Sequence, residues 1–293
     1  MRRPHVRLLV PALAALALLL GLAAPAAATP RPAHPPQPLD YVALGDSYSA
    51  ASGVLPPDPT AAPQCLRSTR NYPHVLAERI GARLTDVTCG GADTGDFTTA
   101  QHPGVPPQLE ALSPETDLVT MTIGGNDSSV FINSILQCGA AGLSTLGQGS
   151  PCRDRYGSSF EDTVRTTTYP ALVRALSAVR AAAPNARVAI LGYPWIMPAS
   201  GGCYPLMPVA TGDVPYLRSL QATLNDAVRR AAEETGVRYV DMSRVSEGRD
   251  ACRPLGVRWV EPVLVGSNPV IVHPNALGEA AMAEQVRQVL RLR

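Results

Sequence analysis

A serine and a histidine stand in sequence settings that suit nucleophilic catalysis. Ser47 ends the segment Gly45-Asp46-Ser47, which directly follows the apolar run 41–44. His273 lies between the extended segment 269–272 and a predicted final helix. An imidazole that reaches the Ser47 hydroxyl can take its proton and so enable attack on a carbonyl carbon. The alternative for Ser47 is a turn or helix-capping serine, which is the commoner role of this residue type.

The other histidines occupy less suitable settings. Outside residues 1–28 the chain has His34, His74, His102 and His273. His34 lies in a proline-rich lead, His74 begins a predicted helix, and His102 lies in a loop. Surface or capping roles suit these three, so His273 is the predicted general base.

Ester hydrolysis also needs hydrogen-bond donors for the oxyanion that forms on the carbonyl oxygen. Gly91 offers an unobstructed backbone N–H, Asn126 offers a side-chain N–H, and the N–H of Ser47 can point the same way. The alternatives are a turn glycine at position 91 and, at position 126, a loop asparagine that bonds its own backbone. The Ser47 segment does not match the Gly-x-Ser-x-Gly elbow of α/β-hydrolases.

Predicted strands and helices alternate along the chain, which is the order that builds a parallel sheet covered on both faces. Ligands bind such sheets at the carboxyl ends of the strands. Ser47, Gly91 and Asn126 each follow one of the first three strands, so we expect them on one rim. The strands are predicted over 41–44, 83–89, 117–123, 187–191 and 237–240, and the helices over 73–80, 169–183, 214–235 and 275–290.

The charged residues exclude several classes of function. All 25 basic residues are arginine, because the sequence contains no lysine. Schiff-base and pyridoxal chemistry and a Walker-type phosphate loop all need a lysine. A balance of 25 basic and 24 acidic side chains gives no reason to expect a nucleic-acid partner. The lack of any Cys-x-x-Cys spacing argues against a zinc site, so we expect no metal and no cofactor.

Residues 1–28 have the order of a secretory signal peptide, with arginines, an apolar run over 8–20 and small residues ending at Ala28. The alternative is a membrane anchor, but Pro11 and Gly21 interrupt a stretch that is short for the roughly 20 apolar residues of a span. Removal of this segment takes away three arginines and no acid, so the formal charge falls from +1 to −2. We expect residues 29–293 to form a single secreted, extracellular domain with a proline-rich lead over 29–38, and no later stretch to span a bilayer.

The six cysteines of an exported chain favour disulfides. The sequence leaves many pairings open, and buried free thiols are the alternative. Spacing favours neighbours, and one neighbouring pair brackets a Gly/Ser-rich segment over 139–151 that is predicted to be a loop. The favoured pairs are Cys65 with Cys89, Cys138 with Cys152, and Cys203 with Cys252.

The segments that carry these residues resemble the four sequence blocks of the SGNH, or GDSL, hydrolase family, in the family's order. They are GDSYS over 45–49, the glycine pair that ends at Gly91, IGGND over 123–127, and HPN over 273–275. The chain is particularly similar to secreted actinomycete GDSL lipases and esterases, in which six cysteines form three disulfides. The resemblance implies a flavodoxin-like three-layer α/β/α sandwich with a parallel five-stranded sheet, the SGNH hydrolase fold. It also implies Ser47 as nucleophile, His273 as base, and Ser47, Gly91 and Asn126 as the oxyanion hole.

One position departs from the family pattern. Many members have an aspartate three residues before the histidine, where this chain has Val270. Some secreted members use a backbone carbonyl instead, so we expect the carbonyl of Val270, or of a neighbour such as Pro269, to accept from His273 Nδ1. A carbonyl fixes the tautomer but stabilises an imidazolium less than a carboxylate does. The nearest upstream acids, Glu261 and Asp250, are the alternatives.

The resemblance implies a cofactor-free carboxylic ester hydrolase, a lipase or esterase, that forms an acyl-enzyme. A polysaccharide or peptidoglycan O-deacetylase and a non-catalytic binding module are the alternatives. Export and apolar loops favour a lipid-like ester over a sugar acetate as the small-molecule substrate, and we expect a monomer. The loops over 139–149 and 200–212 can border the site, and the candidates for an apolar acyl channel are Tyr48, Trp195, Ile196, Met197 and Leu206.

Overall fold

The computed structural model describes residues 37–293, so the predicted signal peptide and most of the proline-rich lead lie outside the described residues. Within that part of the chain, five parallel strands form one sheet in the order β2-β1-β3-β4-β5. The central strand β3 is buried along its whole length, whereas the edge strand β2 alternates between exposed and half-buried residues. The strands are β1 (Asp40–Ala43), β2 (Arg83–Asp86), β3 (Leu118–Met121), β4 (Arg187–Leu191) and β5 (Arg238–Val240).

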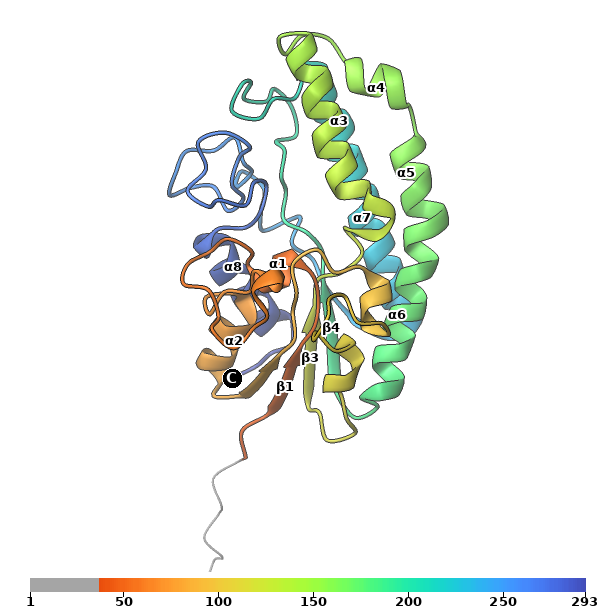
Figure 1. The fold of residues 1–293 in the computed structure, drawn as a ribbon, viewed down its shortest axis with the longest axis vertical. Coiled ribbons are helices and arrows are strands. Elements are labelled where there is room, and N and C mark those ends of the chain that lie inside the picture. The colour runs from red at the N-terminus through yellow and green to blue at the C-terminus, as the bar shows by residue number, and fades with distance from the viewer. Residues whose placement is uncertain (1–36) are drawn as a thin grey trace, which may run out of the picture. The chain divides into compact units, whose positions relative to one another are not determined.

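Helices cover both faces of the sheet and make three layers (Figure 1). Helices α2 (Tyr72–Ile80) and α8 (Ala276–Val289) pack together on one face. Helices α6 (Tyr169–Ala182) and α7 (Val214–Thr235) pack together on the other. This is the flavodoxin-like α/β/α arrangement that the sequence predicts, with β1 and β3 on either side of the point where the strand order reverses.

The strand register brings the predicted site residues to one end of the sheet. Val42 of β1 pairs with Thr85 of β2 and with Val119 of β3. Because the strands are parallel and in step, the segments after β1, β2 and β3 emerge at the same edge. The opposite edge carries the end of the chain, where the Arg187 guanidinium at the start of β4 donates a hydrogen bond to the Leu290 carbonyl.

The segment between β3 and α6 is more helical than the sequence suggests. Helix α3 (Val130–Ser144) continues through Gly139 and Gly142, so the first part of the predicted loop 139–149 is helical. A Cβ on Gly142 would lie 2.3 Å from the Pro208 carbonyl oxygen, so this glycine allows close packing and does not end the helix. The remaining short helices are α1 (Ser47–Ala50), α4 (Pro151–Tyr156) and α5 (Ser159–Thr163), a π-helical turn over Val164–Thr168, and 3₁₀ turns over Pro63–Cys65, Thr94–Phe97, Gln108–Ala111, Asp127–Ser129 and Thr211–Asp213.

Three disulfides join neighbouring cysteines in the described residues, the pairing that the spacing favours. One of them fastens the middle of α3, at Cys138, to α4. A closed loop of about 15 residues contributes roughly 3 kcal/mol in the chain-entropy model. The pairs are Cys65–Cys89, Cys138–Cys152 and Cys203–Cys252.

Two apolar clusters form the interior of residues 38–293. The larger surrounds the sheet and its four covering helices. The smaller contains Met197, Met207, Val209 and Val272 and is built from the long segments that follow β4 and β5. The side chain of Phe131, in the first turn of α3, packs against both clusters. No helix in residues 37–293 is long and apolar enough to cross a membrane.

Candidate active site

Ser47 lies where β1 turns sharply into the short helix α1. Asp46 caps that helix, and its carboxylate accepts a hydrogen bond from the Tyr48 N–H at 3.0 Å. The turn requires glycine at position 45, which has φ 124° and would place a Cβ only 2.5 Å from the Thr122 carbonyl oxygen. The Gln108 side chain holds both backbone groups of Gly45, accepting from the N–H at 2.6 Å and donating to the carbonyl at 3.1 Å. The serine side chain is thereby fixed at the carboxyl edge of the sheet.

The His273 ring reaches Ser47 across 226 residues of sequence. Its Nε2 lies 2.7 Å from Ser47 Oγ, and its Nδ1 lies 2.7 Å from the Ile271 carbonyl oxygen. The carbonyl can only accept, so Nδ1 carries the proton and Nε2 is free to accept from the serine hydroxyl. Burial lowers the pKa of His273, although the hydrogen bond to Ile271 opposes this shift. The imidazole is therefore neutral at pH 7 and available as a base.

The carbonyl that lies against His273 Nδ1 belongs to Ile271, the residue after the expected Val270, and not to Val270 or Pro269. The reason is a local reversal of the chain, since Val272 has φ 53°, in the left-handed region. This conformation is rare for a β-branched residue, and it places the carbonyl two residues before the imidazole against Nδ1. The Tyr48 hydroxyl donates to the Val272 carbonyl at 2.7 Å and fastens this turn to the Ser47 segment.

The two acids that were alternatives for this position make other contacts. No carboxylate among the described residues hydrogen-bonds to the His273 ring. Asp250 accepts from the Cys252 N–H and from the Arg253 side chain. Glu261 is buried, and its carboxylate accepts from the side chain of Asn275, two residues after the histidine, at 2.8 Å. Its backbone N–H also donates to the His273 carbonyl at 2.9 Å.

Gly91 and Asn126 lie on segments that are fastened to Ser47 and to each other. The Cys89 N–H donates to the Gly45 carbonyl at 3.0 Å, and Asn126 Nδ2 donates to the Ala92 carbonyl at 2.9 Å. The second N–H of the Asn126 amide and the backbone N–H groups of Ser47 and Gly91 have no acceptor among the described residues. The site therefore holds three polar N–H donors that are free to bind an oxyanion.

A buried polar network connects the serine segment to the Asn126 segment. The Asp46 carboxylate accepts from the Thr122 hydroxyl at 2.6 Å and from the Tyr193 hydroxyl. The Tyr193 oxygen in turn accepts from the Gly125 N–H at 3.0 Å. Burial raises the pKa of Asp46 to about 6, while these hydrogen bonds oppose the rise. Sequence reasoning missed Thr122 and Tyr193, because only the sheet brings these uncharged side chains next to Asp46.

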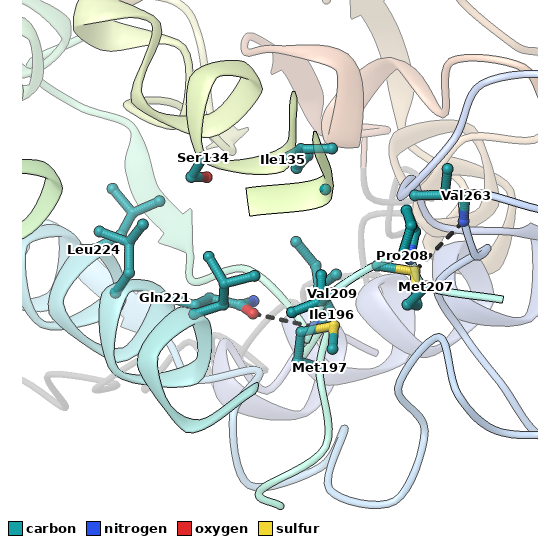
Figure 2. A pocket seen from close by; sticks show the side chains of 13 residues that line it. Ser134, Ile135, Ile196, Met197, Met207, Pro208, Val209, Gln221, Leu224 and Val263 are labelled. Atoms are coloured by element: carbon teal, nitrogen blue, oxygen red, sulfur yellow. Dashed lines mark hydrogen bonds between the residues drawn. The ribbon is translucent and has the colours of Figure 1, made fainter. Parts of the chain in front are cut away.

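Aromatic side chains enclose the imidazole. The ring centroids of Tyr48 and Phe131 lie 5.2 and 6.0 Å from that of His273. Of the other candidates for an apolar channel, Ile196 and Met197 line an apolar cavity (Figure 2), while Trp195 stacks under the Arg218 guanidinium at 3.5 Å. Tyr48 and Phe131 thus pack against the His273 ring.

The remaining histidines of the described part lie elsewhere. His74 sits in the first turn of α2, with Nδ1 2.7 Å from the capping oxygen of Asn71, and His102 lies in a half-buried loop. Residues 37–293 contain no group of three His, Cys, Asp or Glu side chains that could hold a metal ion.

Comparison with known proteins decides the family. Residues 43–281 match the model of the GDSL-like lipase/acylhydrolase family. The chain belongs to this family. The GDSL-like enzyme is 64% identical over 272 residues to Lipase 2 of Streptomyces coelicolor, an alignment that covers 92% of this chain and 90% of that protein. It is also 31% identical to a lipase of Streptomyces rimosus, with 83% of this chain and 84% of that protein covered.

Solved structures give the same relationship. The GDSL-like enzyme superposes on phospholipase A1 from Streptomyces albidoflavus NA297 with a TM-score of 0.69 and 30% identity, covering 86% of this chain and 97% of that one. It superposes on the extracellular lipase from Streptomyces rimosus with a TM-score of 0.71 and 27% identity, covering 86% and 99%. The protein is therefore a carboxylic ester hydrolase of the lipase and esterase type with the SGNH hydrolase fold.

Proposed function

We propose that this enzyme hydrolyses esters through a Ser47–His273 dyad and an acyl-enzyme intermediate. The observation that carries the proposal is the 2.7 Å contact between Ser47 Oγ and His273 Nε2, combined with the 2.7 Å contact between Nδ1 and the Ile271 carbonyl. The second contact fixes the tautomer that leaves Nε2 as a proton acceptor. A backbone carbonyl thus performs the orienting part of the role that a carboxylate has in a catalytic triad.

The first half-reaction transfers the acyl group to the enzyme. His273 Nε2 takes the Ser47 proton as Oγ attacks the carbonyl carbon, and the carbonyl oxygen becomes an oxyanion. The N–H groups of Ser47, Gly91 and Asn126 bind that oxyanion, and each such donor stabilises the transition state by about 3–4 kcal/mol. His273 then returns the proton to the alcohol oxygen, which leaves and restores the carbonyl as a serine ester.

Water completes the reaction by the same route in reverse. His273 takes a proton from water, hydroxide attacks the acyl carbon, and the proton passes to Ser47 Oγ as the carboxylic acid leaves. No cofactor enters either half-reaction. The imidazolium that forms in each half faces a neutral carbonyl at Ile271, so its stabilisation comes from the oriented peptide dipole and not from a carboxylate.

We also propose that residues 1–28 direct export and that the mature enzyme, residues 29–293, acts outside the cell as a monomer. The three disulfides support this proposal, since such bonds persist in oxidising compartments. The Streptomyces rimosus relative is named as an extracellular lipase. Intact-mass measurement of protein from the culture medium of a secreting host tests the removal of the leader.

A lipid-like ester is the proposed substrate class. Hydrolysis of p-nitrophenyl esters of increasing chain length, measured beside emulsified triglyceride and an acetylated sugar, tests this choice. The variant Ser47→Ala should retain the urea-unfolding midpoint of the parent and lose turnover of every ester, together with labelling by a fluorophosphonate probe. Turnover in Ser47→Ala, or labelling at another residue, would refute the dyad.

A further inference from the structure

An apolar cavity lies between α3 and α7 (Figure 2). Its wall belongs to the smaller apolar cluster, against which Phe131 also packs, and the Phe131 ring lies 6.0 Å from that of His273. Its volume is about 70 Å³, so it can admit a short stretch of hydrocarbon chain and not a whole drug-sized ligand. Figure 2 shows Ser134 and Ile135 on the α3 side, Gln221 and Leu224 on the α7 side, and Met197 on the segment after β4. All lining residues are uncharged.

The wall of this cavity offers no free polar side chain. Gln221 uses its amide internally, because its oxygen accepts from the Ile196 N–H at 3.0 Å and its nitrogen donates to the Pro194 carbonyl at 2.7 Å. The Ser134 hydroxyl donates to the Phe131 carbonyl at 2.9 Å within α3. A sugar or peptide would lose its bonds to water here without gaining others, whereas a hydrocarbon chain loses none. The cavity therefore suits an alkyl ligand.

Helix α3 leads from the catalytic histidine into the cavity. Phe131, Ile135 and Gly139 follow one another at intervals of four residues and share one face of the helix. Phe131 lies against the His273 ring, and the next two line the cavity. With a rise of 1.5 Å per residue, Gly139 lies about 12 Å along the helix axis from Phe131. An acyl group that starts at Ser47 and follows this face reaches Gly139 only if it is long.

Gly139 leaves space at the far end of that face. A Cβ built at this position would meet only the Pro208 ring, at 3.6 Å, which is ordinary van der Waals contact, so the backbone leaves room for a side chain to begin there. Gly142 differs, because a Cβ there would lie 2.3 Å from the Pro208 carbonyl oxygen. Packing thus requires glycine at position 142 and does not require it at position 139.

We propose that this cavity binds the distal part of a medium- or long-chain acyl group during ester hydrolysis, and that Gly139 sets the length of chain admitted. The inference rests on the proposed function, since the cavity acts on a chain that is attached at Ser47. The two methionines of its wall, Met197 and Met207, have flexible side chains that can adjust to chains of different length.

The variant Gly139→Leu tests this proposal. Each methylene of the substrate that is buried in the cavity raises kcat/KM about fourfold. A leucine side chain that displaces three of these methylenes should therefore lower kcat/KM for a long chain on the order of 60-fold. We expect Gly139→Leu to lower kcat/KM for p-nitrophenyl octanoate and dodecanoate by that order and to leave acetate and butyrate within about twofold. Helix propensity favours leucine over glycine, so α3 should remain folded.

The matched control is Ala140→Leu, which places the same side chain on the exposed face of α3. It should leave the whole chain-length profile unchanged. If Gly139→Leu lowers the melting temperature, Val263→Phe adds bulk from another segment that lines the cavity and should give the same selective loss. An unchanged ratio of dodecanoate to acetate hydrolysis in both cavity variants would overturn the proposal.

A binding measurement separates this proposal from the dyad. Isothermal titration of Ser47→Ala with decanoic acid should show binding that the additional change Gly139→Leu weakens by the same order. Absence of binding in a folded Ser47→Ala protein overturns the acyl cavity even if the dyad is right. If Ser47→Ala still hydrolyses p-nitrophenyl acetate, the dyad is overturned. That result does not bear on the acyl cavity, because the cavity is tested by the binding of decanoic acid to the same variant.

Discussion

Replacement of Glu261 by glutamine tests whether the histidine is held by a carbonyl or by an acid. Glu261 Oε1 accepts from Asn275 Nδ2 at 2.8 Å and from the Ser267 hydroxyl at 2.9 Å, and Oε2 accepts from the Arg258 guanidinium at 2.7 Å and the Ser267 N–H at 2.8 Å. All four partners are donors. Burial raises the pKa of Glu261, but these hydrogen bonds outweigh it and hold the pKa below its ordinary value.

The structure sets the size of the expected loss of stability. A glutamine amide nitrogen in place of either oxygen faces two donors, and it leaves the buried Arg258 without a counter-charge. Breaking a buried ion pair by removing one partner costs about 3–5 kcal/mol, so the free energy of unfolding of Glu261→Gln should fall by this amount. Urea denaturation measures it. Because Glu261 ionises at lower pH in the folded than in the unfolded protein, its contribution is present above the unfolded pKa and is lost as pH falls through the folded pKa.

Activity should change far less than stability. The Ile271 carbonyl still holds Nδ1 in Glu261→Gln, and the Glu261 backbone N–H still donates to the His273 carbonyl. We expect kcat for p-nitrophenyl butyrate to fall less than about tenfold when the variant is assayed well below its melting temperature, whereas loss of a true triad acid lowers kcat about 10,000-fold.

The matched control is Glu279→Gln, which makes the same substitution at another buried glutamate. Burial raises the pKa of Glu279 well above its ordinary value and so favours the protonated form, and its one hydrogen-bond partner among the described residues is the Tyr72 N–H at 2.7 Å. A glutamine resembles the protonated acid, so this change should cost less stability than Glu261→Gln. A loss of several orders of magnitude in kcat for Glu261→Gln, absent from Glu279→Gln, would refute the assignment of the histidine to a carbonyl.

Two further predictions concern the segment that presents His273. Tyr48→Phe removes the hydroxyl that donates to the buried Val272 carbonyl, so the free energy of unfolding should fall by about 1–3 kcal/mol. Because this bond positions the turn before His273, kcat should also fall, with little change in KM. An unchanged urea-unfolding midpoint would contradict this prediction. The kcat/KM for p-nitrophenyl butyrate should fall at low pH with a midpoint below the ordinary histidine pKa of 6.5. The reason is that burial favours the neutral imidazole, and only this form accepts the Ser47 proton. A midpoint above 6.5 would show that the charged imidazolium is stabilised, against this prediction.

The fold and the position of the site follow from regularities that a sequence displays. Apolar runs that alternate with amphipathic helices specify a parallel sheet, and a parallel sheet brings the segments after β1, β2 and β3 to one edge. Ser47, Gly91 and Asn126 could therefore be located from their places after the predicted strands. The partner of His273 could not, because the turn depends on Val272 adopting a left-handed conformation that its residue type disfavours.

The prediction of a loop over 139–149 was wrong for its first part, where α3 continues. Gly139 and Gly142 fall in a Gly/Ser-rich segment that reads as a loop, because glycine disfavours a helix by about 1 kcal/mol relative to alanine. In the structure the helix continues, since its glycines allow contact with the segment that contains Pro208. That contact joins residues about 70 positions apart, and no local pattern indicates it. Thr122 and Tyr193 could not be predicted for the same reason, because they become hydrogen-bond partners of Asp46 only in the folded sheet.

The end of the chain lies at the edge of the sheet opposite to Ser47 and His273, next to the start of β4 (Figure 1). A tag attached after Arg293 would anchor the enzyme to a solid support with its ester site directed away from the surface. The sequence also contains no lysine, so amine-reactive linkers have no side chain to attack. Coupling through the C-terminus would therefore give a layer of uniformly oriented enzyme, in which every molecule presents its acyl cavity to the emulsion above it.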